Sequence, residues 1–167
     1  MKNLKSLLIA TVLFLGANQV TTAQAKTAHV NTSELMQKFP AMIEAQKQLE
    51  TLGKTYQVEY KTMGEEYTAK IKKYEGESST AGDKVNAERQ KEVQDLEKRI
   101  QEYGQTAQKE IQTKETDLMK PLQEKIKLAI QKVGKAKGFQ YILDANGLLL
   151  ADGPDLTADV KKELGFK

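Results

Sequence analysis

Few side chains in this sequence could carry out chemistry. His29 is the single histidine among 167 residues and cysteine is absent, so a Ser-His-Asp or Cys-His arrangement would depend on His29 alone. His29 stands beside Val30 in a short β-prone stretch, where a structural role is the simpler interpretation. The nucleotide-binding patterns GxGxxG and GxxxxGK[ST] and the GxSxG turn of serine hydrolases do not occur. The sequence therefore predicts that the protein is not an enzyme and binds no nucleotide cofactor.

A metal site is equally hard to find in the sequence. Asp144, Asn146 and Asp152 surround Gly147 and distantly resemble a calcium-binding loop. Their spacing does not fit the pattern of such a loop, and a tight turn explains the same residues. No metal and no other cofactor is expected.

Two groups of side chains could instead form a binding surface. Three lysines stand close together, and tyrosines recur at helical spacing before and among them. Packing inside the helical region is the alternative role for the tyrosines, since a tyrosine ring can be packed while its hydroxyl stays in water. The candidates for contact with a partner are Tyr60, Tyr67, Tyr74, Lys70, Lys72 and Lys73.

The first 25 residues resemble a secretory signal peptide. Lys2 and Lys5 precede an apolar run, and Ala23-Gln24-Ala25 fits a small-residue cleavage site. We expect residues 1–25 to be removed and the protein to be exported to the periplasm; an uncleaved membrane anchor is the alternative. Removal of the two lysines leaves 24 basic against 23 acidic residues. This near-neutral balance argues against nucleic acid as a partner.

Two long helices are expected to account for most of the remaining chain. In the first, apolar residues recur every seven positions, which is the spacing of a coiled-coil seam. We expect Thr32 or Ser33 to cap this helix, with Glu34 in its first turn, where a carboxylate suits the helix dipole. Pro40 predicts a break near its start. The two rows of the seam are Leu35, Met42, Leu49, Tyr56 and Met63, and Phe39, Gln46, Gly53, Tyr60, Tyr67 and Tyr74.

The second helix is expected from about residue 83 to about residue 137, with apolar rows that recur every eleven residues. Pro121 predicts a bend in this helix but not its end. Between the two helices, glycines and small polar residues predict a turn, with the tip near 76–82. Helices joined by a short turn fold back on each other. A turn centred near Ser79 would place Tyr56 opposite Tyr103.

The end of the chain differs from the charged helices. Asn146-Gly147 is a strong signal for a two-residue hairpin turn. Apolar segments flank it on both sides, so the sequence predicts a C-terminal β-hairpin in addition to a short N-terminal strand. A last helix is expected over residues 156–164 and should end at Gly165.

Such a small sheet exposes apolar edges and faces. Leu148, Leu149 and Leu150 are consecutive and would point to both faces of one strand. Pairing between copies of the chain would bury them, so we expect a homo-oligomer; coverage of the sheet by the last helix within one monomer is the alternative. The candidate interface residues are Val30, Phe139, Tyr141, Leu143, Leu148, Leu149 and Leu150.

At this point the chain resembles the Skp/OmpH family of periplasmic chaperones. The resemblance lies in the signal peptide, a strand at His29-Val30-Asn31 that enters a helix, the charged helical hairpin, and the ending from Tyr141 to Leu164. It implies a homotrimer in which strands from three chains form a small β body and three helical arms enclose a cavity. It also implies an ATP-independent holdase that keeps unfolded outer-membrane β-barrel proteins soluble. An anionic membrane surface remains open as a further partner.

The predicted fold is thus mainly α with a small β body and a long antiparallel helical hairpin that forms a coiled-coil-like arm. Residues 26–38 and 130–167 are expected to form the oligomerisation body, and residues 39–129 the arm. The alternative function is that of a non-enzymatic coiled-coil protein that tethers surfaces of the cell envelope. It would share the arm and the oligomer but would not bind unfolded chains.

Overall fold

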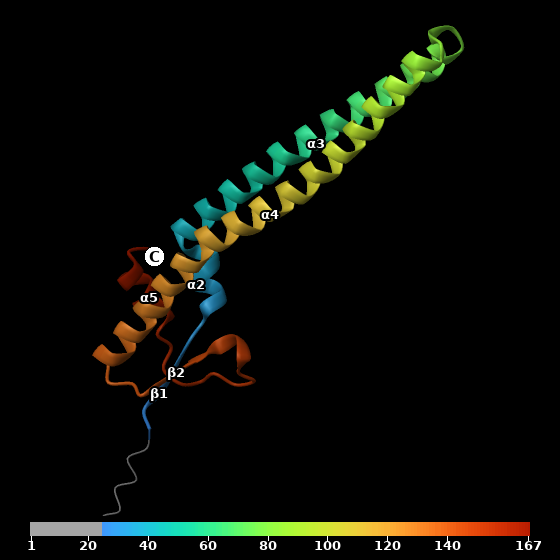
Figure 1. The fold of residues 1–167 in the computed structure, drawn as a ribbon. Coiled ribbons are helices and arrows are strands. Elements are labelled where there is room, and N and C mark those ends of the chain that lie inside the picture. The colour runs from blue at the N-terminus through green and yellow to red at the C-terminus, as the bar shows by residue number, and fades with distance from the viewer. Residues whose placement is uncertain (1–24) are drawn as a thin grey trace, which may run out of the picture.

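The computed structural model describes residues 25–167, and almost all of the predicted signal peptide lies outside this range. The described chain is a long two-helix arm on a small body that contains both ends of this range (Figure 1). No helix in residues 25–167 combines the length and the apolar character needed to cross a bilayer. In chain order the elements are β1 (Thr27–Val30), α2 (Thr32–Lys38), α3 (Pro40–Ala81), α4 (Asp83–Ala136), β2 (Tyr141–Asp144), the 3-10 helix η1 (Ala145–Gly147) and α5 (Thr157–Leu164).

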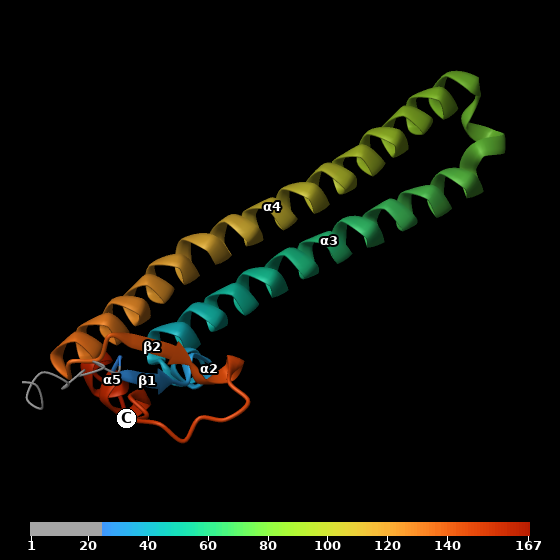
Figure 2. The same ribbon diagram turned by 90° about the horizontal axis from the view of Figure 1, so that it is seen from below.

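The arm consists of α3 and α4, which run antiparallel and confirm the predicted helical hairpin (Figure 2). The chain reverses at a single residue, Gly82, whose φ of 79° is a conformation that glycine adopts readily. The expectation of a turn that begins near residue 76 was wrong, because residues 76–81 continue α3. One reason is that the hydroxyls of Ser78 and Thr80 bond back to carbonyls of the preceding turn, 2.9 and 3.0 Å away, inside the helix.

The predicted alignment of the two arm helices is confirmed at the middle of the arm. The rings of Tyr56 and Tyr103 meet edge to face with centroids 5.9 Å apart. The Tyr103 hydroxyl donates to Glu59 at 2.9 Å. Gly104 lies beside Tyr60, and a Cβ at this position would be in ordinary van der Waals contact with the tyrosine ring, at 3.4 Å. The contact between Tyr56 and Tyr103 is the one that the seven-residue spacing of α3 predicted for the middle of the arm.

Pro40 follows the predicted break and Pro121 does not end α4, as predicted, while the bend at Pro121 stays a prediction. Phe39 has an extended backbone and separates α2 from α3, and Pro40 is the first residue of α3. Helix α4 continues through Pro121.

The predicted first cap is wrong. The side chain that caps α2 is Asn31, whose oxygen accepts from the Glu34 N–H at 2.9 Å. The expectation of Thr32 or Ser33 as the cap was wrong, since both residues lie inside α2 and the Thr32 hydroxyl bonds to Asp144 at 2.6 Å.

The small sheet contains two parallel strands, in which residues 27–30 of β1 pair with residues 141–144 of β2. The predicted C-terminal hairpin was wrong: residues 145–147 form η1, Gly147 has no positive φ, and residues 148–151 form no strand. The side chain of Asp144 accepts from the Asn146 backbone N–H at 3.1 Å and from its side-chain amide at 2.8 Å. These bonds form an Asx turn, which replaces the two-residue hairpin turn.

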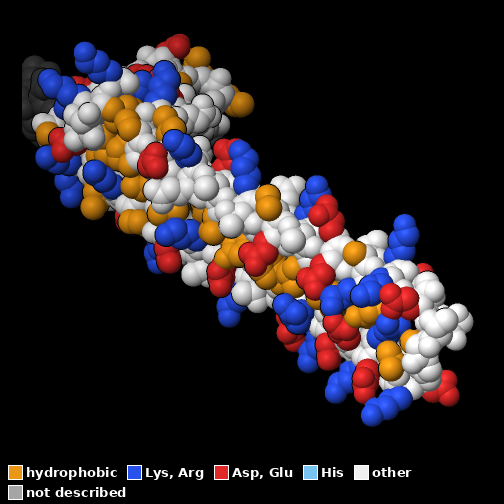
Figure 3. Space-filling model, turned by 90° about the horizontal axis from the view of Figure 1, so that it is seen from above, with side chains coloured by type: hydrophobic (Ala, Val, Ile, Leu, Met, Phe, Trp, Pro, Cys, Tyr) orange, Lys and Arg blue, Asp and Glu red, His pale blue; other side chains and the backbone are white. Residues whose placement is uncertain are grey.

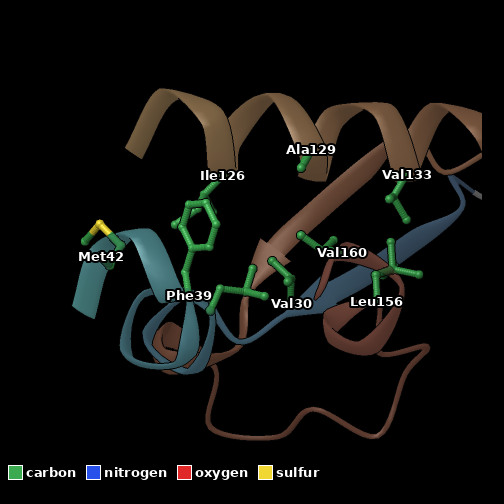
Figure 4. Packing of buried hydrophobic residues seen from close by; sticks show 10 residues of the cluster. Val30, Phe39, Met42, Ile126, Ala129, Val133, Leu156 and Val160 are labelled. Carbon is green, nitrogen blue, oxygen red and sulfur yellow. The ribbon is translucent and has the colours of Figure 1, made fainter. Parts of the chain in front are cut away.

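One apolar cluster holds the body together and ties it to the base of the arm (Figure 4). Ile126, Ala129 and Val133 of α4 face β1 and the last helix in this cluster. Full burial of one such aliphatic side chain contributes about 1.5–3 kcal/mol. The cluster extends beyond the expected limits of the body, so we use "body" for residues 25–45 and 119–167 and "arm" for residues 46–118. The buried members are Ala28, Val30, Leu35, Phe39, Met42, Ile126, Ala129, Val133, Leu156 and Val160.

Helix α5 packs as the sequence predicted and adds an ion pair to the body. Gly165 ends it in the left-handed conformation, with φ 85°. The Lys161 ammonium donates to Glu34 at 2.5 Å and Lys38 donates to the same carboxylate at 2.9 Å. The hydrogen bond from Lys161, followed by that from Lys38, lowers the pKa of Glu34 from 4.5 to about 2. The ionised carboxylate of Glu34 thus links α2 to α5.

Candidate binding surfaces on the arm and the body

Two of the candidate contact residues near the tip make contacts between the two arm helices. The carboxylate of Glu92 on α4 accepts from Lys70 and from the hydroxyl of Tyr74, both on α3. These bonds lower the pKa of Glu92, with Lys70 as the main cause, and raise the pKa values of Lys70 and Tyr74. The guanidinium carbon of Arg89 lies 4.7 Å from the Tyr74 ring centroid. Lys70 and Tyr74 therefore already bind a carboxylate of the other arm helix, and a partner would compete for them.

The other candidates on the arm are more accessible. Lys72 and Lys73 are exposed, and neither forms an ion pair with another residue in the range 25–167. Tyr60 is 50% exposed although its ring packs against Gly104, while Tyr67 is half-buried. Tyr60, Lys72 and Lys73 are thus the candidates whose side chains a partner could reach without opening the arm.

A shallow groove of about 390 Å³ lies at mid-arm, around the Tyr56–Tyr103 pair. Burial and the hydrogen bond to Glu59 raise the pKa of Tyr103 to about 12, so its hydroxyl stays protonated. The bond to Glu110 raises the pKa of Tyr56 in the same way. The groove is lined by Gly53, Tyr56, Gln57, Tyr60, Tyr103, Gly104, Ala107, Gln108 and Ile111.

Sequence analysis missed several accessible apolar side chains. Val58 is 65% exposed on α3, and Ile43 and Leu128 are also exposed. On the face in Figure 3, hydrophobic surface is broad over the body and breaks into separate spots among charged side chains along the arm. Val58 does not belong to either predicted seam row, which is a signal that could have identified it.

The body exposes most of the predicted interface residues. Tyr141 is 60% exposed, Leu150 is 74% exposed, and Leu149 is fully exposed. Leu143 is exposed as well, whereas Phe139 and Leu148 are half-buried. Helix α5 therefore does not cover Leu149 and Leu150 within this chain.

Val30 is the exception among the interface candidates. It is 2% exposed and packs inside the core of its own body, which leaves almost no surface for a second copy. This burial argues against a direct interface contact by Val30, because α5 and α4 cover its side chain from within the chain. The sequence of a short strand does not by itself specify which of its two faces will be covered by helices from distant parts of the chain.

The two-stranded sheet has one edge without a partner in the described part of the chain. The far side of β1 is occupied, since the His29 N–H donates to Pro154 O at 2.9 Å and the Leu156 N–H donates to His29 O at 2.9 Å. On the other side, β2 pairs with β1 alone. An unpaired strand edge beside exposed leucines can accept another strand.

His29 itself has the structural environment that its sequence context suggested. It is 8% exposed and its Nε2 lies 4.0 Å from an Asp155 oxygen, next to the bridge that joins β1 to the C-terminal segment. Within residues 25–167, no cluster of three or more histidine, cysteine or acidic side chains has the arrangement needed for a metal ion.

Taken together, the geometry defines a class of protein: a small α/β body with exposed apolar residues that carries one long antiparallel helical arm. A family model described as outer membrane protein (OmpH-like) matches residues 26–164. The chain belongs to this OmpH-like family.

Curated relatives and a solved structure agree with this assignment. The chain is 26% identical to the chaperone protein Skp of Pectobacterium atrosepticum over 153 residues, which cover 91% of this chain and 93% of that protein. It is 29% identical to the chaperone protein Skp of Yersinia pseudotuberculosis, with the same coverage. The structure of an OmpH-like protein from Caulobacter crescentus has the same fold, with a TM-score of 0.76, 18% identity, and coverage of 84% of this chain and 83% of that one.

Proposed function

We propose that this protein is a chaperone that binds unfolded outer-membrane β-barrel proteins and keeps them soluble without ATP. The observation that carries the proposal is the thinness of the arm: from residue 46 to residue 95 no side chain is buried. Within the whole arm, residues 46–118, only Leu96 and Ala107 are buried, so both helices offer accessible surface over most of their length. Many weak contacts of this kind hold a client and release it without nucleotide. Family membership and the relatives named as Skp chaperones support the same conclusion.

The proposed chaperone acts as a homotrimer assembled through the body. Exposed apolar residues on β2 and on the following loop favour pairing between copies, and the open edge of β2 provides a place for an incoming strand. In this arrangement the three arms project from one β body and surround the client. The part of the body that is proposed to form the oligomer comprises residues 26–38 and 130–167.

We place the chaperone in the periplasm, to which residues 1–25 would direct it as a cleaved signal peptide. In this proposal it has no enzymatic activity and no cofactor. Contacts with clients are assigned to Tyr60, Tyr67 and Tyr74 and to the lysines at positions 70, 72 and 73. An anionic membrane surface is a further proposed partner, through exposed lysines such as Lys72 and Lys73.

The test is dilution of a urea-denatured outer-membrane β-barrel protein into nucleotide-free buffer, with light scattering as the readout. Expression from the full coding chain allows natural removal of residues 1–25. The proposal expects suppression of aggregation at about one trimer per client, with the client recovered in a soluble complex. Unchanged turbidity would contradict it. A trimer by light scattering that fails to capture the client would favour the envelope-tethering alternative.

A further inference from the structure

The outer part of the arm is held together differently from its base. Apolar burial is concentrated in the body, and on α4 the outermost buried residue is Leu96. Beyond Leu96, toward Gly82, every residue on both helices is at least partly exposed. The hydrophobic effect therefore contributes much less per residue in the outer arm than in the body.

In the outer arm, charged and polar contacts between α3 and α4 join the two helices in place of apolar burial. Glu92 joins α4 to Lys70 and Tyr74 of α3, as described above. Arg89 donates to Glu77 across the arm and stacks over the Tyr74 ring. We call these five residues the latch: Lys70, Tyr74, Glu77, Arg89 and Glu92.

The latch lies beside apolar side chains that would otherwise face water. Ile71, Tyr74 and Val93 are half-buried and line a groove of about 460 Å³ next to Arg89. Separation of the two helices here would uncover the apolar faces of these three residues. The contacts that hold this part of the arm closed thus also control access to apolar surface.

The contacts of the latch are individually weak. Its ion pairs are partly exposed, with side-chain exposures of 29% and 47% for Lys70 and Glu92, and such pairs are weak and screened by salt. One guanidinium nitrogen of Arg89, Nη1, is buried without a hydrogen-bond partner among the described residues, which opposes closure. Local opening of a segment with so few buried contacts requires much less free energy than unfolding of the body.

We propose that the outer arm, residues 70–94, opens as a separate unit that the latch holds closed, and that opening exposes Ile71, Tyr74 and Val93 while the body stays folded. The latch is a property of the arm and does not depend on the chaperone role. If the chaperone proposal also holds, opening provides apolar surface for the client at the outer arm.

Hydrogen–deuterium exchange of the native assembly, read by mass spectrometry, tests the latch. Glu92→Gln removes the charge that attracts Lys70 and weakens the bond from Tyr74. Glu102→Gln is the matched control, since Glu102 lies on the same helix and, among residues 25–167, pairs only with Lys98, four residues away, at 3.7 Å. We expect Glu92→Gln to accelerate exchange of residues 70–94 about fivefold. Exchange of residues 126–133 should not change, and Glu102→Gln should affect neither segment.

Salt provides a second measurement on the unmodified protein. An increase from about 0.05 M to about 1 M NaCl should accelerate exchange of the same outer segment in the wild-type protein. The acceleration should be smaller in Glu92→Gln, because only the Arg89–Glu77 pair of the latch then remains to be screened. Equal exchange in Glu92→Gln and Glu102→Gln would overturn the proposal. So would acceleration that spreads equally into the body, or a wild-type outer arm whose exchange is insensitive to salt. These outcomes are independent of whether the protein binds unfolded clients.

Discussion

Among the glycines of residues 25–167, Gly134 is the one whose added Cβ would lie nearest to a neighbouring atom. It lies on α4 where the helix crosses β2, and a Cβ at this residue would lie 2.2 Å from Cδ1 and 3.2 Å from Cγ1 of Ile142. Carbon atoms in contact are normally separated by about 3.5–4.0 Å. Gly134→Ala would therefore force Ile142 into another rotamer or move β2 away from α4.

The expected magnitude follows from two opposed effects. Overpacking of this kind costs about 1–3 kcal/mol, whereas replacement of glycine by alanine inside a helix gains about 1 kcal/mol. Gly134→Ala should therefore lower the free energy of unfolding by about 1 kcal/mol on balance. Gly64→Ala is the matched control, because it is also helical and nothing lies within 4 Å of its added Cβ. It should raise the free energy of unfolding by about 0.5–1 kcal/mol.

Urea unfolding followed by circular dichroism measures both variants, at one fixed protein concentration because assembly contributes to the apparent stability. Ile142→Val removes the Cδ1 methyl group and completes a double-mutant cycle. In the wild-type protein, Ile142→Val should cost about 0.5–1.5 kcal/mol. In the Gly134→Ala variant, the same change should cost about 1 kcal/mol less, because it relieves the clash. Equal stability of Gly134→Ala and Gly64→Ala, or strict additivity of the cycle, would refute the close approach of α4 and β2.

Three other substitutions test the remaining surfaces. Glu34→Gln should reduce the fall in the free energy of unfolding between about pH 4.5 and pH 2. The reason is that a carboxylate with a lowered pKa stabilises the fold above its ordinary pKa and loses this contribution as it is protonated. An unchanged acid-unfolding profile would contradict the ion pair. Leu149→Ser combined with Leu150→Ser should shift the mass measured by light scattering toward the monomer at about 1 μM, whereas the exposed Leu128→Ser should not; an intact oligomer in the double variant would remove these leucines from the interface. Tyr60→Ser should raise the chaperone concentration needed for half suppression of client aggregation about twofold, and full activity would exclude Tyr60 from the client surface.

The arm could be predicted from the sequence because its signals are local. Seven-residue spacing indicated the face of α3 that meets α4, and the contact between Tyr56 and Tyr103 confirms the alignment. Gly165 ended the last helix as expected, since a left-handed terminal residue is a property of glycine itself. The predicted tip was too long because Gly76 and its polar neighbours are only weak helix breakers, and hydroxyl bonds within α3 accommodate them.

The candidate surfaces were predicted less completely. The sequence identified Leu149 and Leu150 as exposed apolar residues but could not separate them from Val30, which is buried. It likewise grouped Lys70 with Lys72, although only Lys70 reaches across the arm to a carboxylate. Each distinction depends on a partner far away in the chain, and spacing within one segment does not specify that partner.

The sequence by itself determined the two long helices, their antiparallel arrangement and the lack of recognisable catalytic motifs. The reason is that hydrophobic periodicity, glycine conformation and residue type are local properties of the chain. Only the tertiary structure decided the parallel pairing of β1 with β2, which joins segments more than a hundred residues apart. It also decided that Asp144 would bind Asn146 and Thr32 and so replace a hairpin with a 3-10 turn. Long-range hydrogen bonds and burial choose among local conformations of similar energy, and the contacts that make the choice exist only after the chain has folded.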